Sequence, residues 1–198
     1  MNQYFDNNIN LKSNIKTFKA IIKNQELTFD TDNGVFSKKG LDFGTRTLLE
    51  KLDLNIIKGD ILDFGCGYGP IGIYLKKVNN LVNIDMIDVN ERSLKLAKKN
   101  ALLNDVNVNI FKSDIYTNVN KKYDFIISNP PIRVGKEILY KILFEAKEYL
   151  KENGQLWIVV NKNQGAKSVV KDLQKAYSVK IIDKNKGFYI ICAINNWH

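Results

Sequence analysis

The most constraining feature of the sequence is a regular alternation of short apolar runs with amphipathic segments from residue 60 onward. Strands joined through helices run parallel and are covered by those helices on both faces. The last two strands have no helix between them, so we expect them to pair antiparallel. The alternation predicts strands at 61–65, 82–89, 106–113, 123–128, 155–161, 178–184 and 187–195. It predicts helices at 70–78, 91–103, 136–150 and 164–177, and Gly154 is expected to stop the helix over 136–150. The sequence therefore predicts an α/β fold, a mostly parallel seven-stranded sheet with an antiparallel C-terminal strand.

A shorter pattern precedes this alternation. Residues 16–30 alternate loosely and break at Asn24-Gln25, which predicts a β-hairpin. Residues 41–54 have helical spacing, with Asp42 or Thr45 as the N-cap. We therefore expect an N-terminal extension over 1–40 that contains the hairpin, followed by the main domain over 41–198.

Charge and composition restrict the class of protein. The net charge of +9 and pI of about 9.4 suit a polyanionic partner, although a Lys-, Asn- and Ile-rich composition can also arise from genome bias. No run approaches the length of a membrane helix and no signal peptide is recognisable, so a cytoplasmic protein is expected. The single histidine is His198, and the two cysteines form no C-x-x-C pair. These counts argue against a zinc site and against a histidine-based nucleophilic mechanism.

A glycine-rich turn follows the first strand of the alternation, with glycines at 65, 67 and 69 before Pro70 opens a helix. Glycines let the backbone approach a ligand closely, and the helix N-terminus presents unpaired N–H groups there. Residues 67–72 also match the dinucleotide motif G-x-G-x-x-G, and Asp88 lies 21 residues after Gly67, where an acid binds a ribose. A dehydrogenase and a methyltransferase both fit these features. Asp63 favours the methyltransferase, because only S-adenosylmethionine brings an ammonium group to this loop.

Two further strand ends carry candidate site residues. Asp114, after the third strand, can accept a hydrogen bond from an adenine amino group while Ile115 packs on the ring, although an aspartate there is often only a turn residue. Asn129-Pro130-Pro131 follows the fourth strand, and the prolines make its backbone rigid. The Asn129 side-chain oxygen and the Pro130 carbonyl can each accept one N–H of a planar amine, which turns the nitrogen lone pair toward a methyl donor. This chemistry depends on positioning and needs no histidine.

Taken together, D-F-G-C-G-Y-G-P-I-G, I-D-V-N and S-N-P-P-I-R resemble the class I methyltransferases of the small-domain type, which have a Rossmann-like fold. The greatest similarity is to bacterial small-subunit ribosomal RNA guanine methyltransferases, and T-D-N-G-V-F-S-K-K-G-L-D-F-G-T extends it over roughly residues 16 to 195. The resemblance implies S-adenosylmethionine as cofactor and methylation of the guanine exocyclic amine in RNA. It implies cofactor binding by Asp63, Gly65, Gly67, Gly69, Asp88, Val89, Asp114, Ile115 and Asn129, and catalysis by Asn129, Pro130, Pro131 and Ile132.

The resemblance also implies a substrate side to the site. Many amine methyltransferases have an aromatic residue after N-P-P, where this chain has Ile132, so we expect Phe36 to stack on the target base instead. Larger relatives carry a duplicated domain that helps to hold RNA and that this sequence does not contain. RNA affinity is therefore expected to depend on the N-terminal hairpin and on Lys38, Lys39, Arg133 and Lys136.

Three other functions compete with this reading. A protein glutamine amide presents the same delocalised NH₂, but that family usually has N-P-P-Tyr, and the basic charge counts against it. A nucleotide- or RNA-binding module without catalysis has no need of the Asn129-Pro130-Pro131 motif. A dehydrogenase lacks a histidine or a Tyr-x-x-x-Lys pair, because Tyr140 and Lys141 are adjacent and diverge on a helix. A monomer and a dimer are both compatible with the sequence, and the RNA partner is expected to be ribosomal RNA or the small ribosomal subunit.

Overall fold

A computed structural model describes residues 11–35, 40–131 and 134–196. Its main element is a seven-stranded sheet with the order β5-β4-β3-β6-β7-β9-β8, in which β9 runs opposite to the other six strands. The strands are β3 (Asp60–Phe64), β4 (Asn83–Asp88), β5 (Asn109–Lys112), β6 (Tyr123–Ser128), β7 (Leu150–Asn161), β8 (Ser178–Asn185) and β9 (Phe188–Ile194). The predicted mostly parallel seven-stranded sheet with an antiparallel C-terminal strand is confirmed.

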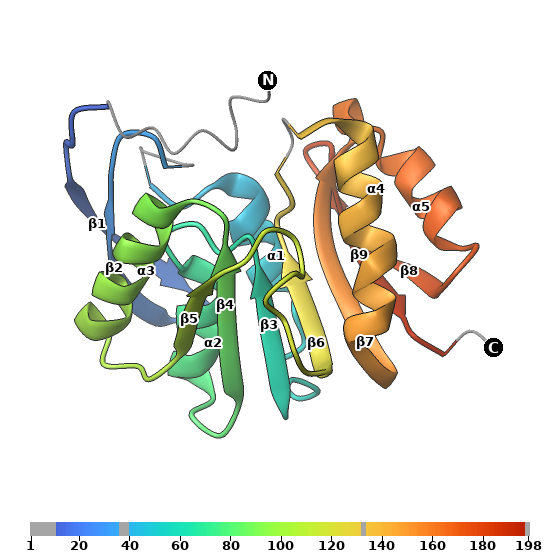
Figure 1. Ribbon diagram of the computed structural model, residues 1–198, viewed down its shortest axis with the longest axis horizontal. Helices are drawn as coiled ribbons and strands as arrows, with labels where there is room; N and C mark the ends of the chain where they lie inside the picture. The colour runs from blue at the N-terminus through green and yellow to red at the C-terminus, as the bar shows by residue number, and fades with distance from the viewer. Residues whose placement is uncertain (1–10, 36–39, 132–133, 197–198) are drawn as a thin grey trace.

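In the part of the chain that the structure describes, five α-helices cover this sheet in two layers (Figure 1). They are α1 (Phe43–Lys51), α2 (Pro70–Val78), α3 (Glu91–Leu103), α4 (Gly135–Glu145) and α5 (Ala166–Leu173). The buried apolar side chains form two clusters, one on each face of the sheet. The first cluster contains side chains of α1, α2 and α3, and the second contains those of α4 and α5. Two-sided coverage explains why the central strands are continuous apolar runs in the sequence.

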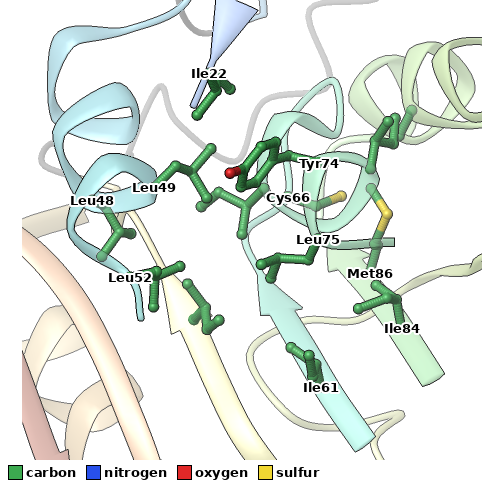
Figure 2. Packing of buried hydrophobic residues seen from close by; sticks show 14 of the residues in the cluster. Ile22, Leu48, Leu49, Leu52, Ile61, Cys66, Tyr74, Leu75, Ile84 and Met86 are labelled. Carbon is green, nitrogen blue, oxygen red and sulfur yellow. The ribbon is translucent and has the colours of Figure 1, made fainter. Parts of the chain in front are cut away.

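The first cluster holds the largest part of the core. Figure 2 shows side chains of this cluster, among them Leu49 of α1 beside Tyr74 of α2, with Leu48, Leu75 and Ile61 of β3 nearby. Each of these five side chains has an exposed fraction of 0%. Full burial of a large apolar side chain contributes about 1.5–3 kcal/mol, so this layer fixes α1 against the sheet. The position of α1 matters for the site, because its N-terminus lies beside the end of β6.

The N-terminal hairpin forms a separate two-stranded sheet, β1 (Lys16–Ile22) and β2 (Gln25–Thr31), whose apolar side chains join the first cluster. Asn100 of α3 and Asn104, the C-cap of that helix, bind the free edge of β2. The Asn100 side chain accepts from Asp30 N at 2.7 Å and donates to Asp30 O at 2.9 Å, and Asn104 repeats this pattern with Thr28. The amides thus satisfy β2 backbone groups as a neighbouring strand does. The hairpin is packed on the main fold, and a domain boundary at residue 40 stays a prediction.

Four local expectations need correction. The helix expected over 136–150 ends at Glu145, a 3₁₀ turn covers Ala146–Tyr149, and β7 starts at Leu150. Gly154 is therefore not a helix stop but a strand residue. A Cβ there would lie 3.0 Å from the Tyr123 carbonyl oxygen of β6. The N-terminal turn is Lys23-Asn24, both with positive φ, rather than Asn24-Gln25. The last helix covers Ala166–Leu173 rather than 164–177. None of the helices in the described residues is long and apolar enough to span a membrane.

Candidate active site

The carboxyl ends of β3, β4 and β6 meet at one edge of the sheet, shown at the top of Figure 1. Strand β3 is central, with β4 on one side and β6 on the other. The glycine turn follows β3, Asp88 is the last residue of β4, and Asn129 follows β6 directly. The structure therefore brings together three of the predicted motifs at the edge where open α/β sheets bind ligands.

The glycine turn leaves an open space above β3. Gly67 has φ of 55°, and nothing lies within 4 Å of the Cβ that another residue would place there. Gly69 has φ of 102°, and its Cβ would come within 2.8 Å of Ile73 and 2.9 Å of Met86. Both φ values are in the region that favours glycine. Gly69 is thus required for packing the loop on α2 and β4, while the space at Gly67, and equally at Gly65, is free for a ligand.

Asp63 lies beneath this turn with an exposed fraction of 0%. Its Oδ2 accepts a hydrogen bond from Gly72 N at 2.9 Å, while its Oδ1 is buried without a partner in the described residues. Burial raises the pKa of the Asp63 carboxyl to about 7, and the nearby Asp88 charge also raises it, against the lowering effect of the Gly72 hydrogen bond. A buried oxygen without a donor is costly unless a ligand supplies one.

Asp88 connects the glycine turn to the end of β4. Its Oδ2 accepts from Gly67 N at 2.9 Å and its Oδ1 from Asn90 N at 2.8 Å. Burial raises the pKa of this carboxyl, although these backbone N–H groups lower it. Each carboxylate oxygen keeps a second lone pair, so Asp88 can still accept from ribose hydroxyls. The sequence motif predicts that Asp88 contacts the ribose. The structure adds that Asp88 also holds the glycine turn through Gly67 N.

A shallow apolar pocket, open to solvent, continues from Asp88 toward α4. Its lining includes the predicted residues Gly65, Val89, Ile115 and Pro131, together with Phe64, Ile87, Ser113, Val134, Ile138 and Ile142, which the sequence did not indicate. Asp114 is exposed and is not among the lining residues. Its carbonyl accepts from Thr117 N at 3.1 Å, which is the behaviour of a turn residue. An adenine contact by Asp114 stays a prediction.

The Asn129 side chain is held from the N-terminus of α1. Its Nδ2 donates to Asp42 Oδ2 at 2.9 Å and to Thr45 Oγ1 at 3.0 Å. Asp42 also caps α1 by accepting from Thr45 N at 3.0 Å, so of the two expected N-caps Asp42 is correct. A carboxylate only accepts hydrogen bonds, so it fixes which end of the amide faces it. The Asn129 Oδ1 is consequently directed away from Asp42.

The remaining predicted residues have varied positions. Pro130 is buried beside Asn129. Lys136 is exposed in the first turn of α4, with its ammonium 5.1 Å from the centre of the Tyr140 ring. Four of the predicted substrate and catalytic residues lie outside the described residues, namely Phe36, Lys39, Ile132 and Arg133. Lys38 lies outside them as well. Sequence reasoning missed the Asp42–Thr45 contact with Asn129, because no periodicity links residues more than 80 positions apart.

Comparisons with known proteins agree with this geometry. The family model described as "Methyltransferase small domain" matches residues 26–192. An uncharacterized Bacillus subtilis protein, YbxB, is 43% identical over 194 residues, with 96% of each chain covered. The ribosomal RNA small subunit methyltransferase C of Psychromonas ingrahamii is 34% identical over 185 residues, which cover 91% of this chain and 52% of that enzyme.

Among solved structures, a T. thermophilus 16S rRNA methyltransferase in complex with AdoMet and guanosine superposes with a TM-score of 0.83. It is 23% identical and covers 93% of this chain, so it shows a common fold. This chain spans about half the length of that protein and of the Psychromonas enzyme. The family match over most of the chain fits the strand-end motifs, and the chain belongs to the methyltransferase small domain family.

Proposed function

We propose that this methyltransferase uses S-adenosylmethionine to methylate the exocyclic amine of a guanine in ribosomal RNA. The observation that carries the proposal is the fixed orientation of the Asn129 amide. Asp42 and Thr45 take its NH₂ group at 2.9 and 3.0 Å, so its oxygen is left to accept a hydrogen bond from a substrate. An acceptor held in this way recognises an N–H donor, which is what an exocyclic amine presents.

The residues of the glycine turn fit the cofactor. The buried Asp63 Oδ1 lacks a donor that the ammonium group of S-adenosylmethionine would supply. Asp88 keeps lone pairs for the ribose, and the apolar pocket lined by Val89 and Ile115 suits the adenine ring. When bound, S-adenosylmethionine supplies a methyl group on a sulfonium, which is a strong electrophile. The chain itself therefore needs to orient the nucleophile more than to activate it.

The chemistry of the acceptor follows from the lone pair of the amine. In a planar base this lone pair is delocalised into the ring, so the nitrogen attacks poorly. Asn129 Oδ1 and the Pro130 carbonyl accept the two N–H groups and hold them on one side, which turns the lone pair toward the methyl group. Positioning of this kind can contribute about 7–11 kcal/mol to lowering a barrier. Once the nitrogen carries the methyl group it becomes acidic, and its proton leaves to water.

Three observations favour ribosomal RNA as the acceptor. The relative that matches 91% of this chain is named for ribosomal RNA small subunit methylation. The T. thermophilus 16S rRNA methyltransferase with the same fold forms a complex with guanosine. The net charge of +9 also favours a polyanionic substrate. Because ribosomal RNA is the proposed substrate, we also expect a cytoplasmic location. A protein glutamine amide presents a similar NH₂ group, so the test must separate the two acceptors.

The test is to identify the acceptor of labelled methyl groups. Purified protein is incubated with radiolabelled S-adenosylmethionine and either small ribosomal subunits or total RNA from cells that lack the gene. RNA and protein are then separated, and the RNA is digested to nucleosides. We expect label in guanosine methylated at its exocyclic amine. Label in the protein fraction, or in no fraction while the cofactor still binds, would contradict the RNA assignment.

A further inference from the structure

A second group of side chains lies at the same edge of the sheet, beside the residues that hold Asn129. The turn between β8 and β9 is formed by Lys186 and Gly187, with φ of 46° and 84°, and β9 begins at Phe188. The Phe188 ring lies 5.5 Å from the ring of Phe43, centre to centre. Phe43 is the first residue of α1 and directly follows Asp42. Phe43 and Phe188, which are far apart in the sequence, thus meet next to Asn129.

Gly44 shows how close the two groups are. A Cβ on Gly44 would lie 3.1 Å from Asp42 Oδ2 and 3.1 Å from Phe188 Cε1, so these two atoms are no more than about 6 Å apart. The Asp42 oxygen is itself 2.9 Å from Asn129 Nδ2. The Phe188 ring is therefore close enough to contact a nucleotide next to one whose amine is held by Asn129.

Two lysines complete this group. The Lys186 ammonium lies 5.3 Å from the centre of the Phe43 ring, and Lys162 N donates to Gly187 O at 2.7 Å. Both side chains are exposed. The segments 161–171 and 184–196 around them contain five lysines and no aspartate or glutamate. The two acids that border these segments both have partners: Asp183 is paired with Lys51 at 3.2 Å, and Asp172 accepts from the Tyr140 hydroxyl and from Lys175 Nζ, each at 2.7 Å. This part of the edge is accordingly cationic as well as aromatic.

We propose that Phe43, Phe188, Lys162 and Lys186, here called the aromatic platform, bind the nucleotide that flanks the target base in single-stranded RNA. This inference rests on the proposed function. Aromatic rings stack on any base, and lysines beside them neutralise phosphates, a combination typical of single-strand binding. A base stacked on Phe43 takes the place of the Lys186 ammonium, which then meets the adjacent phosphate. An acidic protein segment needs the cations but gains little from the two rings.

The experiment measures binding of a short fluorescent single-stranded RNA by anisotropy at several salt concentrations. The charge variant is Lys162→Glu with Lys186→Glu. Its matched control is Lys58→Glu with Lys122→Glu, two exposed lysines that precede β3 and β6 at the opposite edge. The stacking variant is Phe188→Leu, which keeps an apolar side chain. Affinity for S-adenosylmethionine and thermal melting are measured on every variant to confirm that each is folded.

We expect the charge variant to bind RNA at least about 10-fold more weakly than the wild type. Its plot of log K against log salt should be less steep by about 1.4, since each of the two phosphate contacts on a single strand contributes about 0.7. Phe188→Leu should weaken binding by about 5- to 150-fold with the salt slope unchanged. The control pair should affect binding and slope much less. Equal losses in the two charge variants, or wild-type affinity in Phe188→Leu, would overturn the proposal.

The outcomes also separate this proposal from the proposed function. If the wild-type protein methylates RNA but the platform variants behave like the control, only the aromatic platform is refuted. If the wild-type protein neither binds nor methylates RNA, the RNA assignment itself has failed. Loss of methyl transfer to a protein acceptor in the platform variants, with RNA binding unchanged, would assign this surface to a protein and overturn the proposal.

Discussion

We predict that Asp63 makes the affinity for the cofactor sensitive to pH. In the folded protein without ligand, burial raises the pKa of this carboxyl to about 7. The proposed cofactor carries an ammonium that only the ionised carboxylate binds well. If the ionised form alone binds, the association constant for the cofactor is proportional to the ionised fraction of Asp63. For a pKa of about 7, this fraction rises about eightfold between pH 5.5 and 6.5. An α-amino group with a pKa near 8 stays protonated across this range.

The same shift has a consequence for stability. In the unfolded chain Asp63 ionises near pH 4, so between about pH 4 and 7 the folded state binds more protons than the unfolded state does. Stability contributed by this group is therefore full below about pH 4 and falls as pH rises to about 7. The difference between these two pKa values corresponds to about 4 kcal/mol. Cofactor binding should offset part of this cost at neutral pH.

The assay is isothermal titration of S-adenosylmethionine at pH 5.5, 6.0 and 6.5, in buffers of different ionisation enthalpy. Binding to the wild-type protein should tighten about eightfold over this range and release a proton. Asp63→Asn is the matched variant, because its side-chain oxygen can still accept from Gly72 N. It should bind the cofactor more weakly, with a flat pH profile, and should be more stable than the wild type at pH 8 without ligand. A flat wild-type profile, or an unchanged profile in the variant, would refute this reasoning.

Three further predictions concern the support of the site. Asp42→Ala should lower kcat/KM by about 10- to 150-fold, since a charge-assisted hydrogen bond to Asn129 contributes about 1.5–3 kcal/mol. Asp42→Asn, which keeps an acceptor oxygen, should restore most of this loss. Equal rates in the two variants would refute an orienting role for Asp42. Gly69→Ala should lower the free energy of unfolding, measured by denaturant titration, by about 1–3 kcal/mol. The loss should be larger than in Gly165→Ala, a site with positive φ but open space around its Cβ; similar losses would assign the effect to backbone strain. Asn100→Ala removes three buried hydrogen bonds and should speed hydrogen exchange of the β2 amides selectively; uniform acceleration would show global destabilisation.

Much of the fold follows from the sequence, because each parallel strand is a short apolar run bounded by turn residues. The exception is β7, whose first residues read as the end of a helix. Leu150 pairs with Tyr123 of β6, and Asn195 N donates to Gly154 O at 2.9 Å. These partners are distant in sequence, so pairing with two neighbouring strands overrides the local helical pattern and the expected helix stop at Gly154.

In the candidate site, too, local patterns are predictable from the sequence and contacts between distant residues are not. Asp63, Gly67 and Asp88 are predictable because each stands at a fixed offset from a strand end. The contact of Asp42 with Asn129 is not, since it depends on how α1 packs against the sheet. Local chemistry indicates only that Asp42 can cap a helix. The sequence thus identifies the groups that face a ligand more readily than those that orient them.

The central claim is that the Asn129 oxygen positions a guanine amine for methylation. The most direct measurement is a single-turnover methyl transfer to small ribosomal subunits with saturating cofactor, in which the methylated nucleoside is identified. Asn129→Ala is compared with Asn55→Ala, an exposed asparagine in the loop before β3. We predict that Asn129→Ala loses at least about 100-fold in rate while still binding the cofactor, and that Asn55→Ala matches the wild type. Formation of the same methylated guanosine at an undiminished rate by Asn129→Ala would contradict the claim.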